Sequence, residues 1–327
     1  MLAPTRCRVP RPFAAVVAVF ALVLALTSAM TDRVRLQGKP KPHPSRVVSG
    51  LPGQTYRPAL DGVRAVAVTA VVLYHVGWLP GGYLGVDFFF VLSGYLITGL
   101  LLTEFARSGR VYFSTFWTRR ARRLYPAILL LVAVYLVELH RIQSEQATLH
   151  ERRGDIVATL FYYANWHFIA TDQSYFASFE SGVSPLRHMW SLAIEEQFYL
   201  AWPLLLVALL AVSRGRKRVV VLAIVAATAV SVALMAYLYA PGDASRAYFG
   251  TDSRAHALLV GAALAVLTAD RTFPLHWRRW IGWVGASAVI VLAAALIWLD
   301  DGQSAYYHGG SLARLPRLSP SSPWCWP

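Results

Sequence analysis

The sequence predicts an all-α protein that crosses a lipid bilayer several times. Of its 327 residues, 56% are hydrophobic and only 15% are charged, and the mean hydropathy is +0.46. That balance is too apolar for an ordinary soluble domain. The apolar residues also come in long blocks, as they do in multi-span helical membrane proteins. We therefore predict a bundle of about eight to nine transmembrane helices.

The charge pattern favours a bilayer over nucleic acid as the partner of this chain. The formal net charge is +14, and almost all of it is arginine, since lysine occurs only at positions 39, 41 and 217. Clustered arginines are typical of the cytoplasmic loops of membrane proteins. A nucleic-acid site would interleave basic and stacking aromatic residues, whereas here the aromatic residues lie in or beside apolar runs. Cys7 and Cys325 lie at opposite ends without metal-ligand or redox spacing, so no metal site is predicted.

Three regions follow from the composition along the chain. Residues 1–56 hold an apolar segment at 13–30, which is a signal-like segment or a signal anchor, and then a basic, proline-containing linker that we expect to be flexible. Residues 57–299 form the predicted membrane domain. Residues 300–327 are a polar tail rich in proline and serine, which is either the natural end of a short protein or the product of a shifted reading frame.

The apolar blocks place the candidate spans, and the arginine clusters orient them. Loops around 107–123, 214–218 and 271–279 carry these clusters and are predicted to be cytoplasmic. Segment 156–170 is short and is either a full or an incomplete crossing. If 124–139, 156–170 and 198–212 all cross the bilayer fully, the 214–218 loop lies outside the cell, although its arginines predict a cytoplasmic position. Either one of these segments is therefore an incomplete crossing, or the positive-inside rule fails at this loop. The candidate spans are 63–79, 83–103, 124–139, 156–170, 198–212, 219–240, 255–268 and 281–299.

Two ionisable residues in the first of these spans are the strongest functional signal. His75 lies near the end of the apolar run 63–79 and Arg64 opens it. Ionisable groups inside a membrane are costly and typically functional. Eleven helical steps are three turns plus about 20°, so both side chains share one face, roughly 17 Å apart along the axis. Asp61, three residues before Arg64, suits a helix start, where an acid is favoured by the helix dipole. A histidine bonded to a carbonyl of a neighbouring helix is the structural alternative for His75.

Four further clusters carry polar groups at the ends of apolar runs. A glycine-rich stretch at 81–94 allows close helix approach, and it holds Asp87, a functional acid or a helix cap. Arg119 and Arg122 share a helical face, which could hold phosphate groups or could act as a topology signal. Pro126 is expected in the first turn of the helix that follows. The remaining candidates in these clusters are Ser93, Trp190, Ser191, Glu195, Asp252 and Arg254.

These clusters, in this order, resemble membrane acyltransferase family 3, whose members O-acetylate bacterial surface glycans. The resemblance covers about residues 57–299 and rests on strings that are specific only in combination. The strings are RPALDGVRAVAV with LYH, GGYLGVDFFFVLSGYLIT, FWTRRARRLYP, HMWSLAIEEQFYLAWP and TDSRAHALLVGAALA. The resemblance implies a fold of roughly ten helices in the plasma membrane. It also implies a cytoplasmic acyl-CoA donor, in the first instance acetyl-CoA, and an extracytoplasmic glycan or lipid-linked sugar acceptor.

The resemblance assigns roles to individual residues. The family's paired Arg and His fall on Arg64 and His75, and its Arg-X-X-Arg motif falls on Arg119 and Arg122, with Arg120 and Arg123 as a second register. Its Trp-Ser-Leu block with a following glutamate falls on Trp190, Ser191 and Glu195.

In the implied mechanism, His75 acts as general base or carries the acyl group, and Glu195 orients it. Arg64 stabilises the oxyanion or holds the thioester, and Arg119 with Arg122 holds donor phosphates. The family usually continues for about two more helices where this chain has its tail, so a truncated, inactive relative is one alternative. A transporter or flippase of lipid-linked sugars is the other, although the internal repeat expected of many transporters is not found.

Overall fold

The described part of the protein is built from helices and contains no β-strand. The computed structural model describes residues 58–142, 146–173, 184–240, 244–269 and some positions within 283–298. The all-α class is thereby confirmed for these residues. The predicted apolar segment 13–30, its linker, most of the span 281–299, the tail 300–327, and both cysteines lie outside the described residues.

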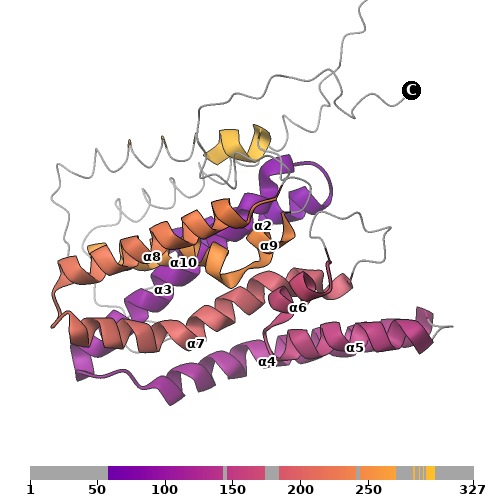
Figure 1. Cartoon of the computed structure of the whole chain (residues 1–327), viewed down its shortest axis with the longest axis horizontal. Helices are drawn as coiled ribbons and strands as arrows, with labels where there is room; N and C mark the ends of the chain where they lie inside the picture. The colour runs from indigo at the N-terminus through magenta and orange to yellow at the C-terminus, as the bar shows by residue number, and fades with distance from the viewer. Residues whose placement is uncertain are drawn as a thin grey trace, which may run out of the picture. The chain divides into compact units, whose positions relative to one another are not determined.

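The chain divides into two compact units between Phe89 and Phe90. The first unit contains α2 (Pro58–His75), the short helix η1 (Pro80–Tyr83) and the start of α3 (Leu84–Ser108). The second unit holds the rest of α3 and the remaining described elements (Figure 1). These are α4 (Phe113–Ile142), α5 (Gln146–Leu160), α6 (Ala164–Ala170), η3 (Pro185–His188), α7 (Met189–Val212), α8 (Lys217–Leu238), α9 (Ser245–Phe249) and α10 (Thr251–Thr268).

Helix α2 carries both Arg64 and His75 but ends earlier than the predicted span 63–79. Gly77 has a φ of +74°, a left-handed conformation that favours glycine. Its N–H donates to the carbonyl of Tyr74 at 3.0 Å, and the N–H of Trp78 donates to the carbonyl of Leu73 at 2.9 Å. This pair of bonds is a Schellman motif, which terminates a helix. The expectation that the helix continues to residue 79 was therefore wrong, and His75 lies in the last turn of α2.

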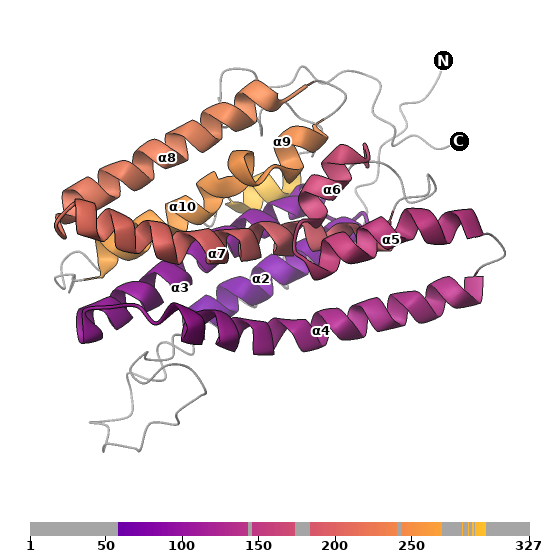
Figure 2. The same ribbon diagram turned by 60° about the horizontal axis from the view of Figure 1, so that its bottom comes forward.

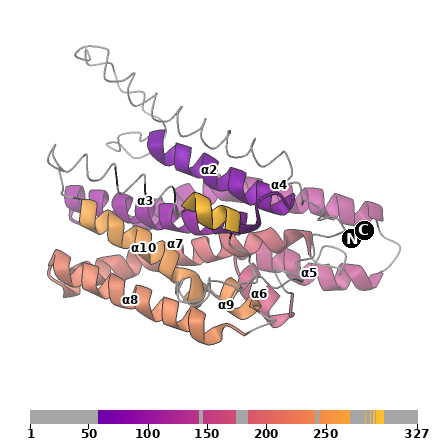
Figure 3. The same ribbon diagram turned by 90° about the horizontal axis from the view of Figure 1, so that it is seen from above.

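The basic connections of the second unit gather at one of its ends. The α3–α4 connection at 109–112 and the α7–α8 connection at 213–216 lie at the same end, whereas α6 and α9 lie toward the other (Figures 1 and 2). The Lys217 ammonium donates to the carbonyl of Leu267 at 3.4 Å, so the start of α8 meets the end of α10. Helices α8 and α10 run side by side along their lengths (Figure 3).

The segment 156–170 is not one continuous helix. Helix α5 ends at Leu160, and α6 begins at Ala164. Between them Tyr162 has a φ of +55°, and the N–H of Tyr163 donates to the carbonyl of Ala158 at 2.9 Å, which closes the end of α5. Of the two alternatives left open for this segment, the structure favours an incomplete crossing. That outcome places the two arginine-rich connections at one end of the unit, as the charge rule requires.

Helix α4 begins eleven residues earlier than the predicted span 124–139. Pro126 lies inside it, so the expectation that this proline occupies a first turn was wrong. The buried stripe of the helix extends to both sides of Pro126. Phe116, Ile128 and Val132 are all buried, and they are separated by multiples of four residues, so they lie on one face of the helix. Burial of this extended stripe outweighs the hydrogen bond lost at the proline. Prolines within membrane helices are tolerated for similar reasons.

Glycines allow two close helix approaches, as predicted from the stretch 81–94. In the first unit, a Cβ on Gly85 would meet the carbonyl oxygen of Ala67 on α2. In the second unit, a Cβ on Gly94 of α3 would meet the backbone of Leu258 on α10. Reciprocally, a Cβ on Gly261 of α10 would meet the carbonyl of Val91 on α3. Two backbones therefore pack directly against each other where α3 meets α10.

Three helices in the described residues are long and apolar enough to cross a bilayer. They are the segments Pro80–Ser108, Pro185–Val212 and Lys217–Leu238. They overlap the predicted spans 83–103, 198–212 and 219–240, and the largest difference is at the start of the second, which begins thirteen residues earlier than predicted. The total of eight to nine crossings stays a prediction.

Candidate active site

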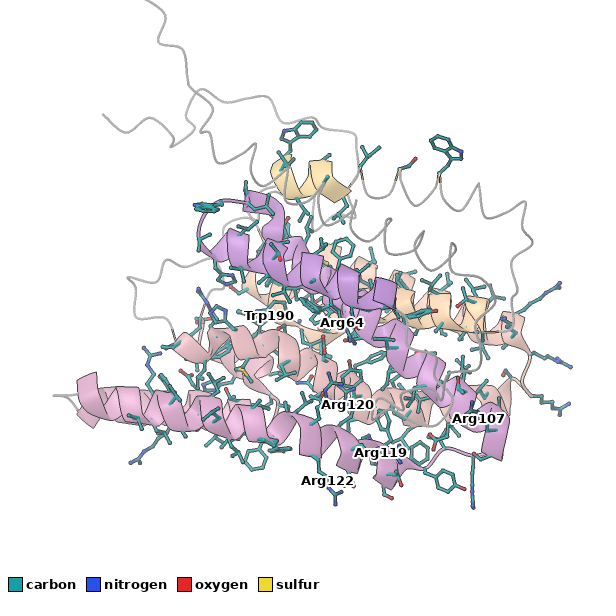
Figure 4. The ribbon with its side chains drawn as sticks, turned by 180° about the vertical axis from the view of Figure 1, so that it is seen from behind. Arg64, Arg107, Arg119, Arg120, Arg122 and Trp190 are labelled. Carbon is teal, nitrogen blue, oxygen red and sulfur yellow. The ribbon has the colours of Figure 1, made fainter. Side chains whose placement is uncertain are left out.

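The arginine cluster of α4 divides between two faces of the helix. Arg120 lies four residues after the buried Phe116, on the inward stripe, and its side chain is 26% exposed. Arg119, Arg122 and Arg123 are exposed on the outer side. Figure 4 shows Arg120 pointing toward α7, whereas Arg122 points away from the helices. The second register of the Arg-X-X-Arg pattern thus supplies the arginine that the fold brings inward.

Arg120 is bound by two side chains of α7. Its Nη2 donates to Oε1 of Glu196 at 3.0 Å, and its guanidinium carbon lies 3.4 Å from the centroid of the Tyr199 ring. The side chain of Glu196 is only 14% exposed, so this ion pair is partly removed from solvent. A cation–π contact and a charge-assisted hydrogen bond therefore fix the guanidinium from two directions. The indole N–H of Trp117 adds a bond to the backbone carbonyl of Tyr199 at 3.0 Å.

Glu195 lies beside this pair and joins a third helix to it. The Tyr199 hydroxyl donates to Oε2 of Glu195 at 3.3 Å. Ser93 of α3 lies within hydrogen-bonding reach of the side chains of Glu195 and Tyr199. The structure thus joins the predicted residues Ser93 and Glu195 in one polar cluster. We call Ser93, Arg120, Glu195, Glu196 and Tyr199 the α7 carboxylate cluster.

The first unit holds Arg64, Asp61 and His75 on α2. Arg64 Nη1 lies 3.2 Å from Asp61 Oδ1, and Asp61 occupies the first turn, both as predicted from the three-residue spacing. The exposed His75 uses Nδ1 in a 2.7 Å hydrogen bond with the carbonyl of Val71, four residues back on the same helix. The structural alternative for this histidine had the carbonyl on a neighbouring helix.

Trp190 and Arg254, predicted from separate motifs, meet in the core of the second unit. The guanidinium carbon of Arg254 lies 5.6 Å from the Trp190 ring centroid, 5.5 Å from that of Phe90 and 4.8 Å from that of Tyr248. Arg254 is fully buried and Trp190 is 2% exposed. Three aromatic rings thus surround one arginine, and cation–π attraction offsets part of its desolvation cost.

The remaining candidates have local partners. Asp252 forms a bidentate ion pair with Arg246, whose Nη1 and Nη2 donate to Oδ1 and Oδ2 of Asp252 at 2.9 and 2.7 Å. These hydrogen bonds hold the pKa of the Asp252 carboxyl below its usual value. The Ser191 hydroxyl donates to the carbonyl of His188 at 3.3 Å. Asp87 lies in the first turn of α3, where the helix dipole favours an acid.

Sequence reasoning missed Glu196 and Tyr199 and treated Arg120 only as a second register. A usable signal was present in the spacing. Extending the stripe of α4 backward from Ile128 in steps of four residues reaches Arg120, and on α7 the steps from Glu195 reach Tyr199. The helix start assumed near residue 124 hid the first of these patterns.

The α7 carboxylate cluster has groups that can bind and orient a substrate and groups that can exchange protons. It combines the two carboxylates and the tyrosine hydroxyl of the apolar α7 with a serine hydroxyl from α3 and a guanidinium group from α4. In low dielectric, such groups interact more strongly than in water. A carboxylate that accepts from the Tyr199 hydroxyl and lies beside that of Ser93 is suited to stabilising a developing positive charge or accepting a proton.

Comparison with known proteins places the chain in a family. Residues 57–316 match the acyltransferase domain of the acyltransferase-3 family. The chain is 41% identical over 267 residues to a candidate peptidoglycan O-acetyltransferase of Bacillus subtilis, covering 79% of this chain and 41% of that protein. It is 41% identical over 264 residues to the peptidoglycan O-acetyltransferase OatA of Listeria monocytogenes, covering 79% and 42%.

A candidate O-acetyltransferase of Staphylococcus aureus is 40% identical over 262 residues, covering 78% of this chain and 42% of that protein. The chain thus spans about two fifths of the length of these relatives. No solved structure matches it. The family match covers well over half of the chain and agrees with the polar motifs carried by its helices, and we conclude that this protein belongs to the acyltransferase-3 family.

Proposed function

We propose that this protein transfers an acyl group from a cytoplasmic acyl-CoA to a hydroxyl group of an extracytoplasmic glycan, and that the acyl group is acetyl. The observation that carries the proposal is the α7 carboxylate cluster. Glu195 lies in an apolar span and is held by hydroxyl groups from α3 and α7. Ionisable groups at such depth typically serve a reaction or a transport path.

The reaction balances as an ordinary acyl transfer. The acceptor hydroxyl loses its proton to a base, its oxygen forms an ester bond with the acyl carbon, and the carbon–sulfur bond of the thioester breaks. The CoA sulfur leaves as a thiolate and takes up a proton. His75 is the proposed base, and the carboxylate of Glu195 stabilises the positive charge that His75 gains with the proton. Arg64 stabilises the negative charge that develops on the carbonyl oxygen of the thioester.

The exposed arginines of α4 are the proposed donor site. Arg119 and Arg122 lie three residues apart on the outer side of the helix. Arginine binds phosphate groups through paired N–H donors, and CoA carries several phosphates. Their helix starts from the α3–α4 connection, which shares one end of the second unit with the basic α7–α8 connection (Figures 1 and 2). The positive-inside rule supports a cytoplasmic position for that end, in a multi-pass protein of the plasma membrane.

The names of the relatives support peptidoglycan as the acceptor class. Two of them are named for O-acetylation of peptidoglycan. The proposal is tested by mass spectrometry of the surface glycan from cells with and without the gene. We expect ester groups only where the gene is present, and we expect His75→Ala to abolish them at matched protein level. Equal ester content with and without the gene would reject the proposed function.

A further inference from the structure

The break between α5 and α6 exposes three aromatic side chains near the end of the second unit that carries α9. Phe161 is 72% exposed, Tyr163 39% and Trp166 37%. Figures 1 and 2 show α6 beside α9, away from the basic α3–α4 and α7–α8 connections. Tyrosine and tryptophan combine an apolar face with a polar edge, so they suit ligands that are themselves amphipathic. A pyranose ring, with one C–H face and a rim of hydroxyl groups, is such a ligand.

Trp166 is held in a fixed orientation. Its indole N–H donates to Oε1 of Gln197 at 3.2 Å. The guanidinium carbon of Arg246 lies 5.0 Å from the centroid of the Trp166 ring, and Arg246 is itself anchored by its ion pair with Asp252. Gln197 is in turn fixed by its Nε2, which donates to Oδ1 of Asn165 at 2.9 Å and to the carbonyl of Tyr162, in the α5–α6 connection, at 2.7 Å. A ring that is immobilised before binding loses little entropy when a ligand stacks on it.

His167 follows Trp166 on α6 and is held by a buried carboxylate. Its Nε2 lies 2.9 Å from Oδ1 of Asp155, whose side chain is 2% exposed. Gln173 and Arg152 also bind this carboxylate, at 3.3 and 3.5 Å. In the tautomer that carries its proton on Nε2, which Asp155 accepts, Nδ1 of His167 is an acceptor.

Space for this ring is provided by a glycine on α5. A Cβ at Gly154 would lie 2.8 Å from the Cε1 atom of His167. The imidazole therefore lies directly against α5, while its side chain stays 18% exposed. Its centroid is 6.5 Å from that of Tyr163, in an edge-to-face arrangement. The His167 ring thus lies next to the exposed rings of Tyr163, which immediately precedes α6, and Trp166, which lies on it.

We propose that Tyr163, Trp166 and His167, which we call the α6 face, bind a pyranose ring of the acceptor glycan. Trp166 stacks on the sugar, and Nδ1 of His167 accepts a hydrogen bond from a sugar hydroxyl group. Asp155 acts as a positioning residue through His167. The inference rests on the proposed function, since it assigns a binding place to the acceptor of that reaction. It commits to a β-1,4-linked N-acetylated glycan, because that is the sugar backbone of peptidoglycan.

The test is a calorimetric titration of the full chain in lipid nanodiscs with a tetramer of β-1,4-linked N-acetylglucosamine. We expect Trp166→Ala to weaken binding about tenfold and Trp166→Phe to retain most of it, because the ring is kept. His167→Gln and Asp155→Asn should each weaken binding about fivefold, in line with one lost hydrogen bond. The matched control is Trp298→Ala, since Trp298 is 77% exposed on another helix, and it should bind as the unaltered protein does.

Each outcome separates the α6 face from the acyl-transfer proposal. If the tetramer does not bind the unaltered protein, or binds the Trp166→Ala and His167→Gln variants equally well, the inference is overturned. Loss of thermal stability in nanodiscs without loss of tetramer binding would likewise overturn it, and would assign these rings to the membrane-interface belt instead. Transfer from acetyl-CoA is measured separately. Binding that depends on the α6 face without any transfer would support the inference and reject the proposed function.

Discussion

Arg120 of α4 donates to Glu196 of α7 at 3.0 Å, and the same guanidinium group covers the ring of Tyr199. This pairing separates Arg120 from its neighbours on α4, which are exposed. One arginine of the cluster thus joins two helices, while the others remain available to a ligand or to lipid headgroups.

We expect Arg120→Gln to destabilise the protein and Arg119→Gln to leave its stability unchanged. The first change leaves the partly buried Glu196 without its cationic partner, which should cost about 1–3 kcal/mol. The second removes an exposed charge. Thermal unfolding of the two variants in the same detergent measures the difference. Equal melting temperatures would show that the Arg120–Glu196 pair contributes nothing to the fold.

The double change Arg119→Gln with Arg122→Gln should affect the use of acyl-CoA without affecting stability, unlike Arg120→Gln. We expect unaltered thermal stability and a rise of well over tenfold in the KM for acyl-CoA, because two charge-assisted phosphate contacts of about 1.5–3 kcal/mol each are lost. Steady-state kinetics with acetyl-CoA as the varied substrate provides the measurement. If KM is unchanged and labelling of engineered cysteines shows inverted loops, these arginines serve topology alone.

The α3–α10 contact predicts that alanine substitutions at Gly94 and Gly99, both on α3, change the stability of the protein in opposite directions. Gly94→Ala should destabilise the protein by about 1–3 kcal/mol, because the new methyl group would meet the backbone of Leu258. Gly261→Ala should act similarly. Gly99→Ala, with no atom near its would-be Cβ, should instead stabilise α3 by about 0.5–1 kcal/mol. Melting temperatures that move in the same direction for Gly94→Ala and Gly99→Ala would contradict the close approach.

The ion pair of Asp252 with Arg246 predicts a pH dependence. The pKa of Asp252 is held below its usual value of about 3.9, so its ionised form is bound more favourably in the folded state than in the unfolded state. The contribution is therefore fully present above pH about 4 and is lost as the pH falls through the lowered pKa. The melting temperature of the unaltered protein should exceed that of Asp252→Asn at neutral pH, and the gap should close in acid. A gap that stays constant down to pH about 3 would contradict this account.

The sequence predicted the helical class, the i, i+3 pairing of Asp61 with Arg64 and the close approach at Gly94, because each follows from local spacing. It did not predict the ends of α2 and α5. Both ends depend on a left-handed residue, Gly77 and Tyr162, and a tyrosine in that conformation carries no sequence signal.

Two features of the site depended on tertiary packing. The start of α4 was misplaced because Pro126 favours a helix start, whereas burial of the stripe that includes Phe116 outweighs that preference. The surroundings of Glu195 were not predictable as a set, since Ser93 lies beside it from α3 and the charge of Arg120 acts on it from α4. Family resemblance supplied Glu195 itself but not the groups that hold it.

Acyl transfer by the α7 carboxylate cluster is tested most directly in liposomes that contain the purified full chain. Radiolabelled acetyl-CoA is the donor, the N-acetylglucosamine tetramer is the acceptor, and the label that reaches the tetramer is counted. The account predicts transfer by the unaltered protein and by Glu104→Gln, whose carboxylate lies outside the cluster and accepts from the backbone of Tyr112. It predicts a loss of about a hundredfold or more for Glu195→Gln, the size typical of losing a group that stabilises charge in the transition state. Transfer by Glu195→Gln at the rate of the unaltered protein would contradict it.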